Sequence, residues 1–322
     1  MQNLRFSRLP LWKVMTDSQG RKINYLRISL TDRCNLRCRY CMGQEGIKNL
    51  RHGEILTYEE ILKMIEIFRT LGVEKFRFTG GEPFVRNGVM DFFEKLDFPF
   101  HITTNLTAPF LDIGRINKLK IASINVSCDS LEPEKYRFIT RGGRLETFLE
   151  NFRKLRVKNK KLNVVLVKNF NDDEVLDFIK FAAQFEADVR FIEKMDFLND
   201  NLDFAPLRPL KKNLIETGII EEESFNEPGG AARYHKMNNS DKRVGFISSM
   251  TEPFCDRCGK IRIKANGDVK LCLFDENSFN MRNILKDGTP CGINDFIYAI
   301  IKKKGKFPDV RRGMEPIAQM GG

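Results

Sequence analysis

Three cysteines fall within one short run of this chain, TDRCNLRCRYCM. Cys34, Cys38 and Cys41 have the spacing C-x3-C-x2-C. Three thiolates so placed can bind three irons of a cubane cluster and leave the fourth iron open to a small molecule, so the spacing indicates redox catalysis. The alternative is a structural zinc site, but zinc usually takes four ligands, often as C-x2-C pairs, and the nearest histidine is His52.

A second group of cysteines lies further along, as Cys255-x2-Cys258 followed by Cys272. Between them, Asn266-Gly267 is flanked by alternating residues and predicts a β-hairpin with a type I′ turn. Closure of that turn would put Cys272 opposite Ile261 and carry it back beside Cys258. The group would then form a second three-thiolate site, whose open iron could bind a nitrogen- or oxygen-bearing substrate.

Two cysteines, Cys128 and Cys291, fall outside both groups. For the second group taken alone, zinc with Cys291 as the fourth ligand is a competing interpretation. Otherwise we expect both thiols to be inert and buried. Eight cysteines are few for 322 residues and their spacings are those of metal sites, so we expect a reducing compartment rather than disulfides.

Strand-like and helix-like segments alternate up to about residue 200. The predicted strands cover residues 24–30, 75–78, 99–103, 121–127, 162–167 and 188–193. The predicted helices cover residues 57–72, 88–96, 108–119, 145–158 and 172–185. Six such units favour an α/β fold with a partial, six-unit parallel β/α barrel, because a full eight-unit barrel needs about 250 residues.

The remainder of the chain has a different character. We predict a helix at 208–217, a polar irregular stretch at 221–241, a compact cysteine-bearing segment at 244–274 and a last helix at 293–304. The expected division is a barrel domain of residues 1–235 and a C-terminal, cluster-binding extension of residues 236–322.

Chemically distinctive residues follow the predicted strands, at the edge where barrel enzymes build their sites. After the cysteine loop come Gly80–Pro83, Thr104-Asn105, Ser127–Asp129, Lys168-Asn169 and Glu193–Met195. The two glycines would let a ligand approach the backbone, and Glu82 offers an acceptor for an ammonium group.

Three predicted strands carry an arginine within them: Arg27, Arg77 and Arg190. Strands of parallel sheets are usually apolar and a buried unpaired charge is costly, so each guanidinium needs a partner. One interpretation is a salt bridge to a neighbouring Asp or Glu. The other is that the three together bind an anion such as a triphosphate.

The composition is 42% hydrophobic, and no apolar run approaches the roughly 20 residues that span a bilayer. The N-terminal residues lack the apolar stretch of a secretory leader, so we expect a cytoplasmic protein. The net charge of +11 fits nucleic acid, a polyanionic small molecule or a solvated surface. No appended nucleic-acid module or aromatic–basic strip is visible in the sequence, so we expect no nucleic-acid partner.

The run TDRCNLRCRYCM with TGGEP at 79–83 resembles the radical S-adenosylmethionine (SAM) superfamily. With CDRC at 255–258, Cys272, RFIEKM at 190–195 and the terminal Gly321-Gly322, the chain is similar to the GTP 3′,8-cyclase family of molybdenum cofactor biosynthesis. The resemblance runs from about Gly20 to the C-terminus.

The resemblance implies two [4Fe-4S] clusters and SAM as cofactors. Cys34, Cys38 and Cys41 would hold the cluster that binds SAM, and Cys255, Cys258 and Cys272 a cluster that contacts the guanine of GTP. The positions matching SAM contacts are Tyr40, Gly81, Ser127 and Met195. Those matching GTP contacts are Arg27, Arg77, Thr103, Thr104, Lys161, Lys260, Ile261 and Arg262. Those matching catalytic residues are Arg190, Gly321 and Gly322.

The implied reaction, a lyase reaction, converts GTP to (8S)-3′,8-cyclo-7,8-dihydroguanosine 5′-triphosphate after a radical removes the ribose 3′ hydrogen. The implied partners are an electron donor and a cyclic pyranopterin monophosphate synthase that receives the product, with the enzyme a monomer or homodimer. One departure is Lys260, where the family usually has an arginine; lysine keeps the charge but lacks the bidentate fork. The rival interpretations are a radical enzyme acting on RNA or a peptide and a zinc-binding protein without catalysis.

Overall fold

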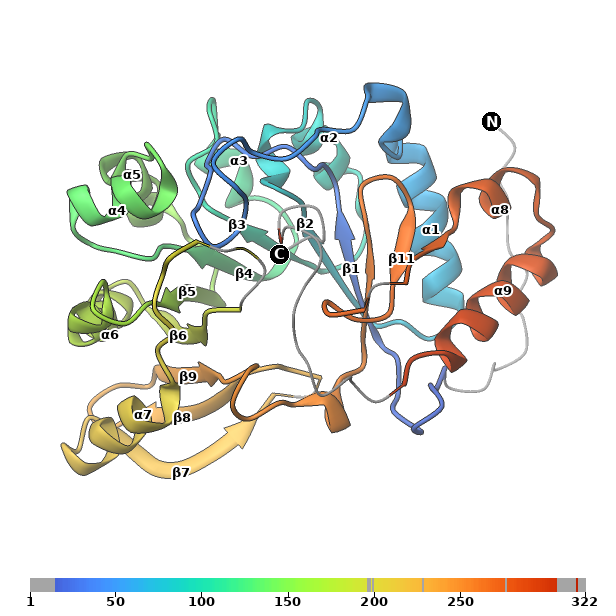
Figure 1. Ribbon diagram of the computed structural model, residues 1–322. Helices are drawn as coiled ribbons and strands as arrows, with labels where there is room; N and C mark the ends of the chain where they lie inside the picture. The colour runs from blue at the N-terminus through green and yellow to red at the C-terminus, as the bar shows by residue number, and fades with distance from the viewer. Residues whose placement is uncertain are drawn as a thin grey trace.

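The computed structural model describes residues 15–195, 198, 200–227, 229–275, 277–305 and 317. Within these residues a twelve-stranded sheet runs in the order β12-β11-β10-β1-β2-β3-β4-β5-β6-β9-β8-β7 (Figure 1). Its parallel strands are β10 (Lys260–Ile263), β1 (Tyr25–Ser29), β2 (Lys75–Thr79), β3 (Phe100–Thr104), β4 (Ile121–Ser127), β5 (Lys160–Leu166), β6 (Ala187–Glu193) and β9 (Arg243–Ile247). The strands added antiparallel at its ends are β7 (Ile220–Asn226), β8 (Arg233–Met237), β11 (Asp268–Lys270) and β12 (Phe279–Asn280).

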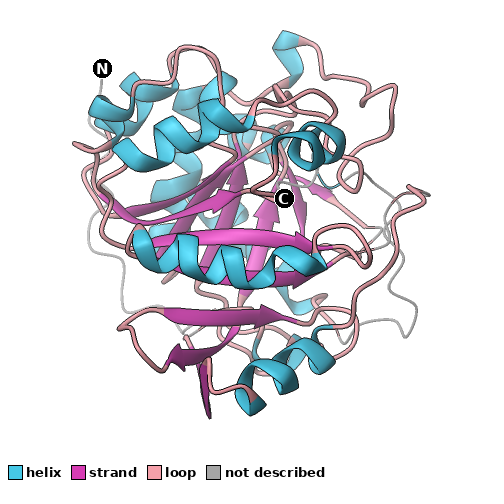
Figure 2. Ribbon diagram, turned by 90° about the vertical axis from the view of Figure 1, so that its left-hand side faces the viewer, coloured by secondary structure: helices cyan, strands magenta, loops and turns pink. Residues whose placement is uncertain are grey.

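Helices cover the outer side of the strands (Figure 2). They are α1 (Tyr58–Thr70), α2 (Val89–Glu94), α3 (Ile113–Ile116), α4 (Pro133–Thr140), α5 (Leu145–Lys154), α6 (Val175–Gln184), α7 (Leu207–Glu216), α8 (Arg282–Asp287) and α9 (Pro290–Lys302). The predicted α/β fold with a parallel sheet is confirmed, and all six predicted strands are present as β1 to β6. In the described part of the chain no helix is both long and apolar enough to cross a membrane.

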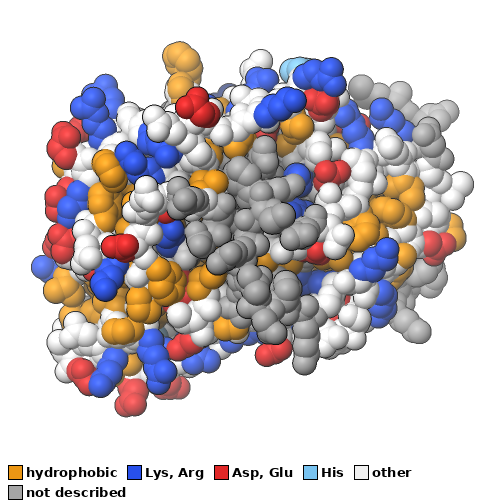
Figure 3. Space-filling view, in the orientation of Figure 1, with side chains coloured by type: hydrophobic (Ala, Val, Ile, Leu, Met, Phe, Trp, Pro, Cys, Tyr) orange, Lys and Arg blue, Asp and Glu red, His pale blue; other side chains and the backbone are white. Residues whose placement is uncertain are grey.

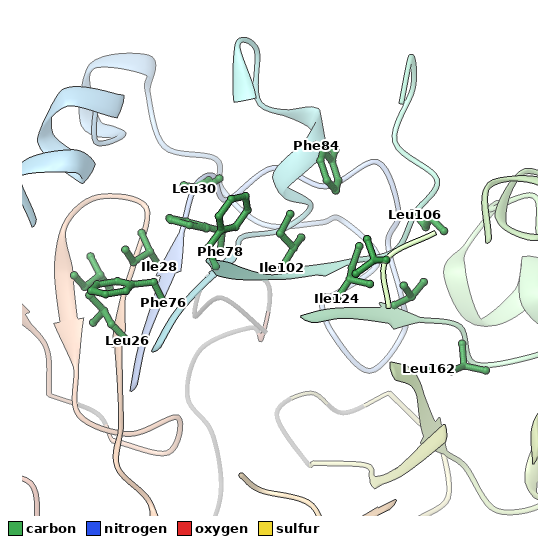
Figure 4. Close-up of a cluster of buried hydrophobic side chains, with 14 of the residues drawn as sticks. Leu26, Ile28, Leu30, Phe76, Phe78, Phe84, Ile102, Leu106, Ile124 and Leu162 are labelled. Carbon is green, nitrogen blue, oxygen red and sulfur yellow. The ribbon is translucent and has the colours of Figure 1, made fainter. Parts of the chain in front are cut away.

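The two faces of the parallel strands differ in chemistry because successive side chains point to opposite sides. The face toward the helices is apolar and buried, and includes Leu26, Ile28, Phe76, Phe78, Ile102, Ile124 and Leu162 (Figure 4). The intervening positions are polar and line a cavity, and include Arg27, Arg77, Thr103, Asn125 and Lys161. This alternation explains how arginines occur within strands of a parallel sheet.

Helix α1 shows how closely local signals determine an element. The Thr57 hydroxyl accepts from the Glu60 N–H at 3.1 Å, and the Glu60 carboxylate accepts from the Thr57 N–H at 2.7 Å. This is the capping box expected from the sequence. The helix ends before Gly72, whose φ of +85° favours glycine.

Two predicted segments differ from the structure, and one helix was missed. The stretch 221–241 contains the antiparallel pair β7 and β8, which the sequence conceals because β7 is a mostly exposed edge strand without an apolar alternation. The predicted helix 108–119 shortens to α3, because Phe110 adopts a positive φ of 59°. Helix α4 was not predicted, although Pro133 at its first turn is a start signal.

The hairpin of β10 and β11 forms, but its predicted register is wrong by one residue. Pairing of Ile261 with Cys272 would place Lys270 opposite Ile263, whereas Lys270 lies opposite Arg262. The turn is closed by the Gly267 N–H donating to the Lys264 carbonyl, and Gly267 has a positive φ of 91°. A three-residue connection with glycine in the last position replaces the two-residue type I′ turn.

Residues after 236 supply strands to both sides of the central sheet: β9 pairs with β6 and β10 pairs with β1. The C-terminal part of the chain therefore completes the curved sheet rather than lying beside it. The division at residue 235 stays a prediction.

Candidate active site

A cavity of about 340 Å³ lies on the polar face of the sheet, and all eight parallel strands contribute to its lining. Both cysteine groups reach it, through Cys34, Cys38, Cys41, Cys255, Cys258 and Cys272. Segments more than 200 residues apart in the sequence thus bring two sets of three thiols to one chamber.

The first cysteine group lies in the loop after β1, with its thiols partly buried and not in disulfides. The Leu36 N–H and the Asn105 amide donate to the Cys34 sulfur at 3.4 and 3.7 Å. Burial raises the pKa of Cys34 to about 11 and that of Cys38 well above its usual value. Metal binding, which requires thiolates, would counter this penalty.

Two guanidinium groups hold the backbone of this loop. Arg37 Nη1 donates to the Cys34 carbonyl at 2.6 Å. Arg141 Nη1, at the end of α4, donates to the carbonyls of Arg37 and Met42, both at 2.9 Å. Hydrogen bonds from these two arginines therefore stabilise the loop conformation that brings the three thiols together.

The Gly80-Gly81 turn packs directly against the cysteine loop. A Cβ on Gly80 would lie 2.7 Å from the Thr31 carbonyl oxygen, and one on Gly81 would lie 2.3 Å from the Arg33 carbonyl oxygen. The Gly81 N–H donates to the former and the Glu82 N–H to the latter, both at 2.8 Å. Glycine is required here because a side chain would prevent the two loops from packing together. This reason differs from the predicted one, which was the close approach of a ligand.

Glu82 is buried between the first cysteine group and β3. Its carboxylate accepts from the Thr104 hydroxyl at 2.8 Å and from the Asn105 N–H at 2.7 Å. Burial nevertheless raises the pKa of Glu82 to about 7. A carboxyl group so placed is well suited to receive a cation, whose charge would favour its ionised form.

The residues implied for SAM gather on this side of the cavity: Tyr40, Gly81, Ser127 and Met195 all line it. The Tyr40 hydroxyl donates to Asp129 Oδ2 at 2.7 Å, and Asp129 Oδ1 accepts from the Val165 N–H at 2.8 Å. Burial raises the pKa of Asp129 to about 6. The pair fixes the orientation of the Tyr40 ring beside the cysteines.

The second cysteine group comes from two segments. Cys255 begins the 3-10 turn Cys255–Arg257, Cys258 follows it, and Cys272 lies just after β11, where its sulfur accepts from the Phe274 N–H at 3.4 Å.

Buried Lys304 bonds to the backbone beside this group. Its Nζ donates to the Lys260 carbonyl at 3.0 Å and to the Leu271 carbonyl. Burial opposes ionisation of Cys258, but Lys304 and Lys260 outweigh it and lower the pKa of that thiol.

Cations crowd the cavity beside the second group. Arg27 in β1 is in register with Arg77 of β2 on one side and Arg262 of β10 on the other. Burial, reinforced by Arg262, lowers the pKa of Arg27 to about 9. Arg262 Nη1 is buried without a hydrogen-bond partner among the described residues. Such buried like charges are unfavourable unless an anion binds among them.

The salt-bridge interpretation does not hold for two of the three strand arginines. Arg77 donates to the Ile102 carbonyl at 2.6 Å and to the Ser123 hydroxyl at 3.1 Å. Arg190 Nε donates to Asn163 Oδ1 at 2.8 Å. Asn163, Ser123 and the Ile102 carbonyl are neutral partners. Arg77 Nε also donates to the Tyr25 hydroxyl. Burial opposes ionisation of Tyr25, but Arg77, Arg27 and Lys260 outweigh it and lower its pKa to about 7, so the phenol offsets part of the cationic charge.

Lys161 does have an acidic partner, because its Nζ lies 2.6 Å from both carboxylate oxygens of Glu227. Lys260 lies over the rings of Tyr25 and Phe254, 5.6 and 5.1 Å from their centroids. Burial lowers the pKa of Lys260 to about 8. Both lysines line the cavity, as do Thr103, Thr104 and Arg190.

Some expected residues lie elsewhere. Ile261 is fully buried in the apolar core and is not part of the cavity lining, because it occupies the opposite strand face from Lys260 and Arg262. Gly321 and Gly322 lie outside the described residues.

The two remaining cysteines differ from each other. Cys128 is buried as expected. Cys291, expected to be buried, is exposed because it lies in the first turn of α9. It does not line the cavity, so the zinc interpretation of the second group loses its fourth ligand.

Among the described residues, no three His, Cys, Asp or Glu side chains converge on a position for one metal ion. Cubane clusters do not need such convergence, because each cysteine binds a different iron and the thiols must stand apart. In both groups the thiols are not in disulfides, and all six line the cavity.

Several cavity residues were not predicted, among them Lys75, Asn125, Asn163 and Glu227. Lys75 lies two residues before Arg77, and Asn163 two residues after Lys161. Because every second residue of a strand points to the same face, both could have been predicted from the inward-facing Arg77 and Lys161. Glu227 lies after an unpredicted edge strand, so no such signal existed for it.

Family models and curated relatives match most of the chain. The Radical SAM superfamily model matches residues 28–182, and the Molybdenum Cofactor Synthesis C model matches residues 187–307. The GTP 3′,8-cyclase of Syntrophomonas wolfei is 40% identical over 290 residues, which cover 85% of this chain and 88% of the relative. Molybdenum cofactor biosynthesis protein 1 of Dictyostelium discoideum is 35% identical over 95% of this chain and 50% of its own length.

Solved structures agree on the fold. The crystal structure of Streptococcus suis SuiB bound to S-adenosylmethionine superposes with a TM-score of 0.62 at 15% identity, over 87% of this chain and 67% of that one. Membership of the superfamily implies a [4Fe-4S] cluster and SAM, and the first cysteine group brings three thiols that are not in disulfides to the cavity. The chain belongs to the radical SAM superfamily and, within it, to the GTP 3′,8-cyclase family.

Proposed function

We propose that this protein converts GTP to (8S)-3′,8-cyclo-7,8-dihydroguanosine 5′-triphosphate, in the first step of molybdenum cofactor biosynthesis. The observation that carries the proposal is the shared cavity, which has one cysteine group at each end of β1 and β10 and a cluster of cationic side chains in its lining. The names of the relatives agree with this activity.

The chain's own residues would position two substrates of opposite charge. Cys34, Cys38 and Cys41 would hold the first cluster, and Glu82 would receive the ammonium group of SAM. When bound, the reduced cluster and SAM supply the radical that removes the ribose 3′ hydrogen. Tyr40, fixed by Asp129, would hold SAM against that cluster.

Cys255, Cys258 and Cys272 would hold a second [4Fe-4S] cluster whose open iron binds the guanine. Arg27, Arg77 and Arg262 would bind the triphosphate, because phosphate oxygens accept charge-assisted bonds from guanidinium groups. Lys161, Lys260, Arg190, Thr103 and Thr104 would complete this side of the cavity. We further propose that Gly321 and Gly322 enter the active site, that the product passes to a cyclic pyranopterin monophosphate synthase, and that the enzyme is a cytoplasmic monomer or homodimer.

Anaerobic incubation with dithionite, SAM and GTP tests the reaction. Release of 5′-deoxyadenosine and of a cyclised nucleotide only when GTP is present supports the proposal. Release with RNA or a peptide but not with GTP would favour the rival substrates. Iron and acid-labile sulfide analysis tests the cofactors, with two [4Fe-4S] clusters per chain expected; zinc without sulfide would contradict both.

A further inference from the structure

Two segments of this chain are basic and free of acidic residues, and the fold joins them. Residues 33–44 hold three arginines and residues 136–145 hold three more, with no Asp or Glu in either. The preceding Lys135 is paired with Glu132 and Asp173. The Arg37 N–H donates to the Thr140 carbonyl at 3.1 Å, and the Arg39 N–H donates to the Ile139 carbonyl at 2.9 Å. The end of α4 therefore lies along the loop that carries the first cysteine group (Figure 1).

This junction has an exposed aromatic residue among its arginines. Phe138 is 45% exposed, and its ring packs against Phe170 with 5.5 Å between centroids. The Arg39 guanidinium lies 3.8 Å from the Phe138 centroid and its Nε donates to the Phe138 carbonyl at 3.0 Å. Arg137 is exposed in the last turn of α4, and Arg141 is the residue that caps the end of this helix, with a positive φ of 53°. We define the arginine face as Arg39, Arg137, Phe138, Arg141 and Arg144.

The arginine face is bonded to the backbone on which the first cluster would sit. Arg141 Nη1 donates to the carbonyls of Arg37 and Met42, which are the neighbours of Cys38 and Cys41. The proposed reaction consumes an electron at this cluster, and the electron must enter from outside the protein. An apolar centre with surrounding charge is typical of the small interfaces formed by electron-transfer proteins.

We propose that the arginine face docks a small acidic protein that carries one electron and delivers it to the first cluster. The inference rests on the proposed function, since it presupposes that cluster. In each transfer the reduced carrier loses one electron and the oxidised cluster gains it, and no bond forms or breaks. Charge complementarity selects the partner, because arginines attract acidic surfaces and accelerate their association.

The test compares two reductants on the cluster-loaded full chain. Arg137→Glu with Arg144→Glu reverses two exposed charges whose side chains form no ion pair within the described residues. Arg153→Glu with Lys154→Glu is the matched control on the far end of α5. With flavodoxin hydroquinone as the probe, the face variant should release 5′-deoxyadenosine about tenfold more slowly than the control. With dithionite, the two variants should match the unmodified enzyme.

Salt and direct binding add independent readouts. Raising the ionic strength should slow reduction by flavodoxin in the unmodified enzyme and should have little effect in the face variant. Equal rates with flavodoxin in both variants would overturn the proposal, as would equal losses with both reductants, which would mean that the arginines serve the site itself. Tighter binding of single-stranded RNA than of flavodoxin to this face would also overturn it. No 5′-deoxyadenosine even with dithionite would refute the proposed function instead, and cluster reduction by flavodoxin, followed by its absorbance, would still test the docking.

Discussion

The two cysteine groups share a cavity and a ligand type but not their electrostatic surroundings. Beside the first lie the buried carboxyl groups of Glu82 and Asp129, which further raise the pKa of Cys34 and Cys38 respectively. Beside the second lie Lys260, Arg262 and Lys304, which favour ionisation of Cys258. The fixed charges of the protein thus change sign across one chamber.

This difference indicates how one cavity can tell two ligands apart. Two clusters that each have one iron without a protein ligand would bind similar groups. The side chains beside each cluster must therefore determine which molecule binds there. Buried carboxyl groups favour a cationic sulfonium and ammonium compound, and buried guanidinium groups favour a polyphosphate. On the face drawn in Figure 3, Lys, Arg, Asp and Glu side chains are interspersed, so the charges visible there show no such separation.

The largest expected effects come from removing one thiol of each group. Cys38→Ser should abolish 5′-deoxyadenosine release, whatever substrate is present, because the radical source is lost. Cys258→Ser should abolish the cyclised product but keep slow, GTP-independent release of 5′-deoxyadenosine. Both are measured by anaerobic chromatography together with iron content. If the two variants released the same amounts of 5′-deoxyadenosine and product, the two cysteine groups would not have separate functions.

Removing one cation should affect only the anion side. Arg262→Met should weaken GTP binding about 10- to 100-fold, since a hydrogen bond to a charged group contributes about 1.5–3 kcal/mol. SAM affinity should not change. Lys118→Met removes an equal charge from an exposed position and serves as the control in the same calorimetric titrations. A matching loss of SAM affinity in Arg262→Met would count against the comparison.

Glu82 should make the cluster-free protein less stable as the pH rises. The unfolded carboxyl ionises near its usual pKa of 4.5, whereas the folded one keeps its proton up to about 7. Between these values the folded state binds more protons, so the free energy of unfolding falls with pH, by about 3 kcal/mol in total. Denaturant unfolding at pH 5 and pH 8 should show this fall, and Glu82→Gln should reduce it. An unchanged fall in Glu82→Gln would contradict the assignment.

Two variants, one beside each cysteine group, should show whether the side chains that hydrogen-bond to the backbone there stabilise only the nearby cluster. Lys304→Met removes donors to two carbonyls beside the second group, and Arg141→Met does the same beside the first. Each should speed cluster loss to a chelator about tenfold at its own site alone, as expected for outer-shell partners. The two clusters are followed by their electron paramagnetic resonance signals. Equal losses at both sites from either variant would show that the supports are not local.

The smallest effect is expected from a change in overall stability that does not distinguish the two cysteine groups. Thr57→Ala removes the helix cap of α1 and should lower the free energy of unfolding by about 1 kcal/mol. Cluster content, GTP affinity and SAM affinity should stay unchanged, as the cap lies outside the cavity lining. A selective change at one cluster would show that helix stability, rather than local charge, distinguishes the two groups.

The parallel core and the first cysteine group could be predicted because their signals are local. The spacing of Cys34, Cys38 and Cys41 lies in one loop, and β1 to β6 have apolar positions at a period of two. The joining of β9 and β10 to opposite sides of that core could not be predicted, since strand pairing across such sequence separations leaves no local trace. Lys304 and Glu227 were missed for the same reason.

The hairpin at Asn266-Gly267 shows an intermediate case. The turn dipeptide correctly indicated a hairpin, but two- and three-residue connections share the same residues and differ in register. The error in register does not affect the prediction that Cys272 joins the second group at the site, because that cysteine still lines the cavity. Ile261 is a separate case: the resemblance matched it to a GTP contact, but it faces the core because neighbouring residues of a strand point to opposite faces.

The most direct measurement uses a variant in which Cys34, Cys38 and Cys41 are all serine, so that only the second group can hold a cluster. Its reduced form is examined by electron paramagnetic resonance with GTP labelled with nitrogen-15, or with labelled SAM. Coupling of the cluster to GTP nitrogen and none to SAM is predicted. Coupling to SAM, or a spectrum that neither ligand changes, would contradict the assignment of opposite charges to the two sides of the cavity.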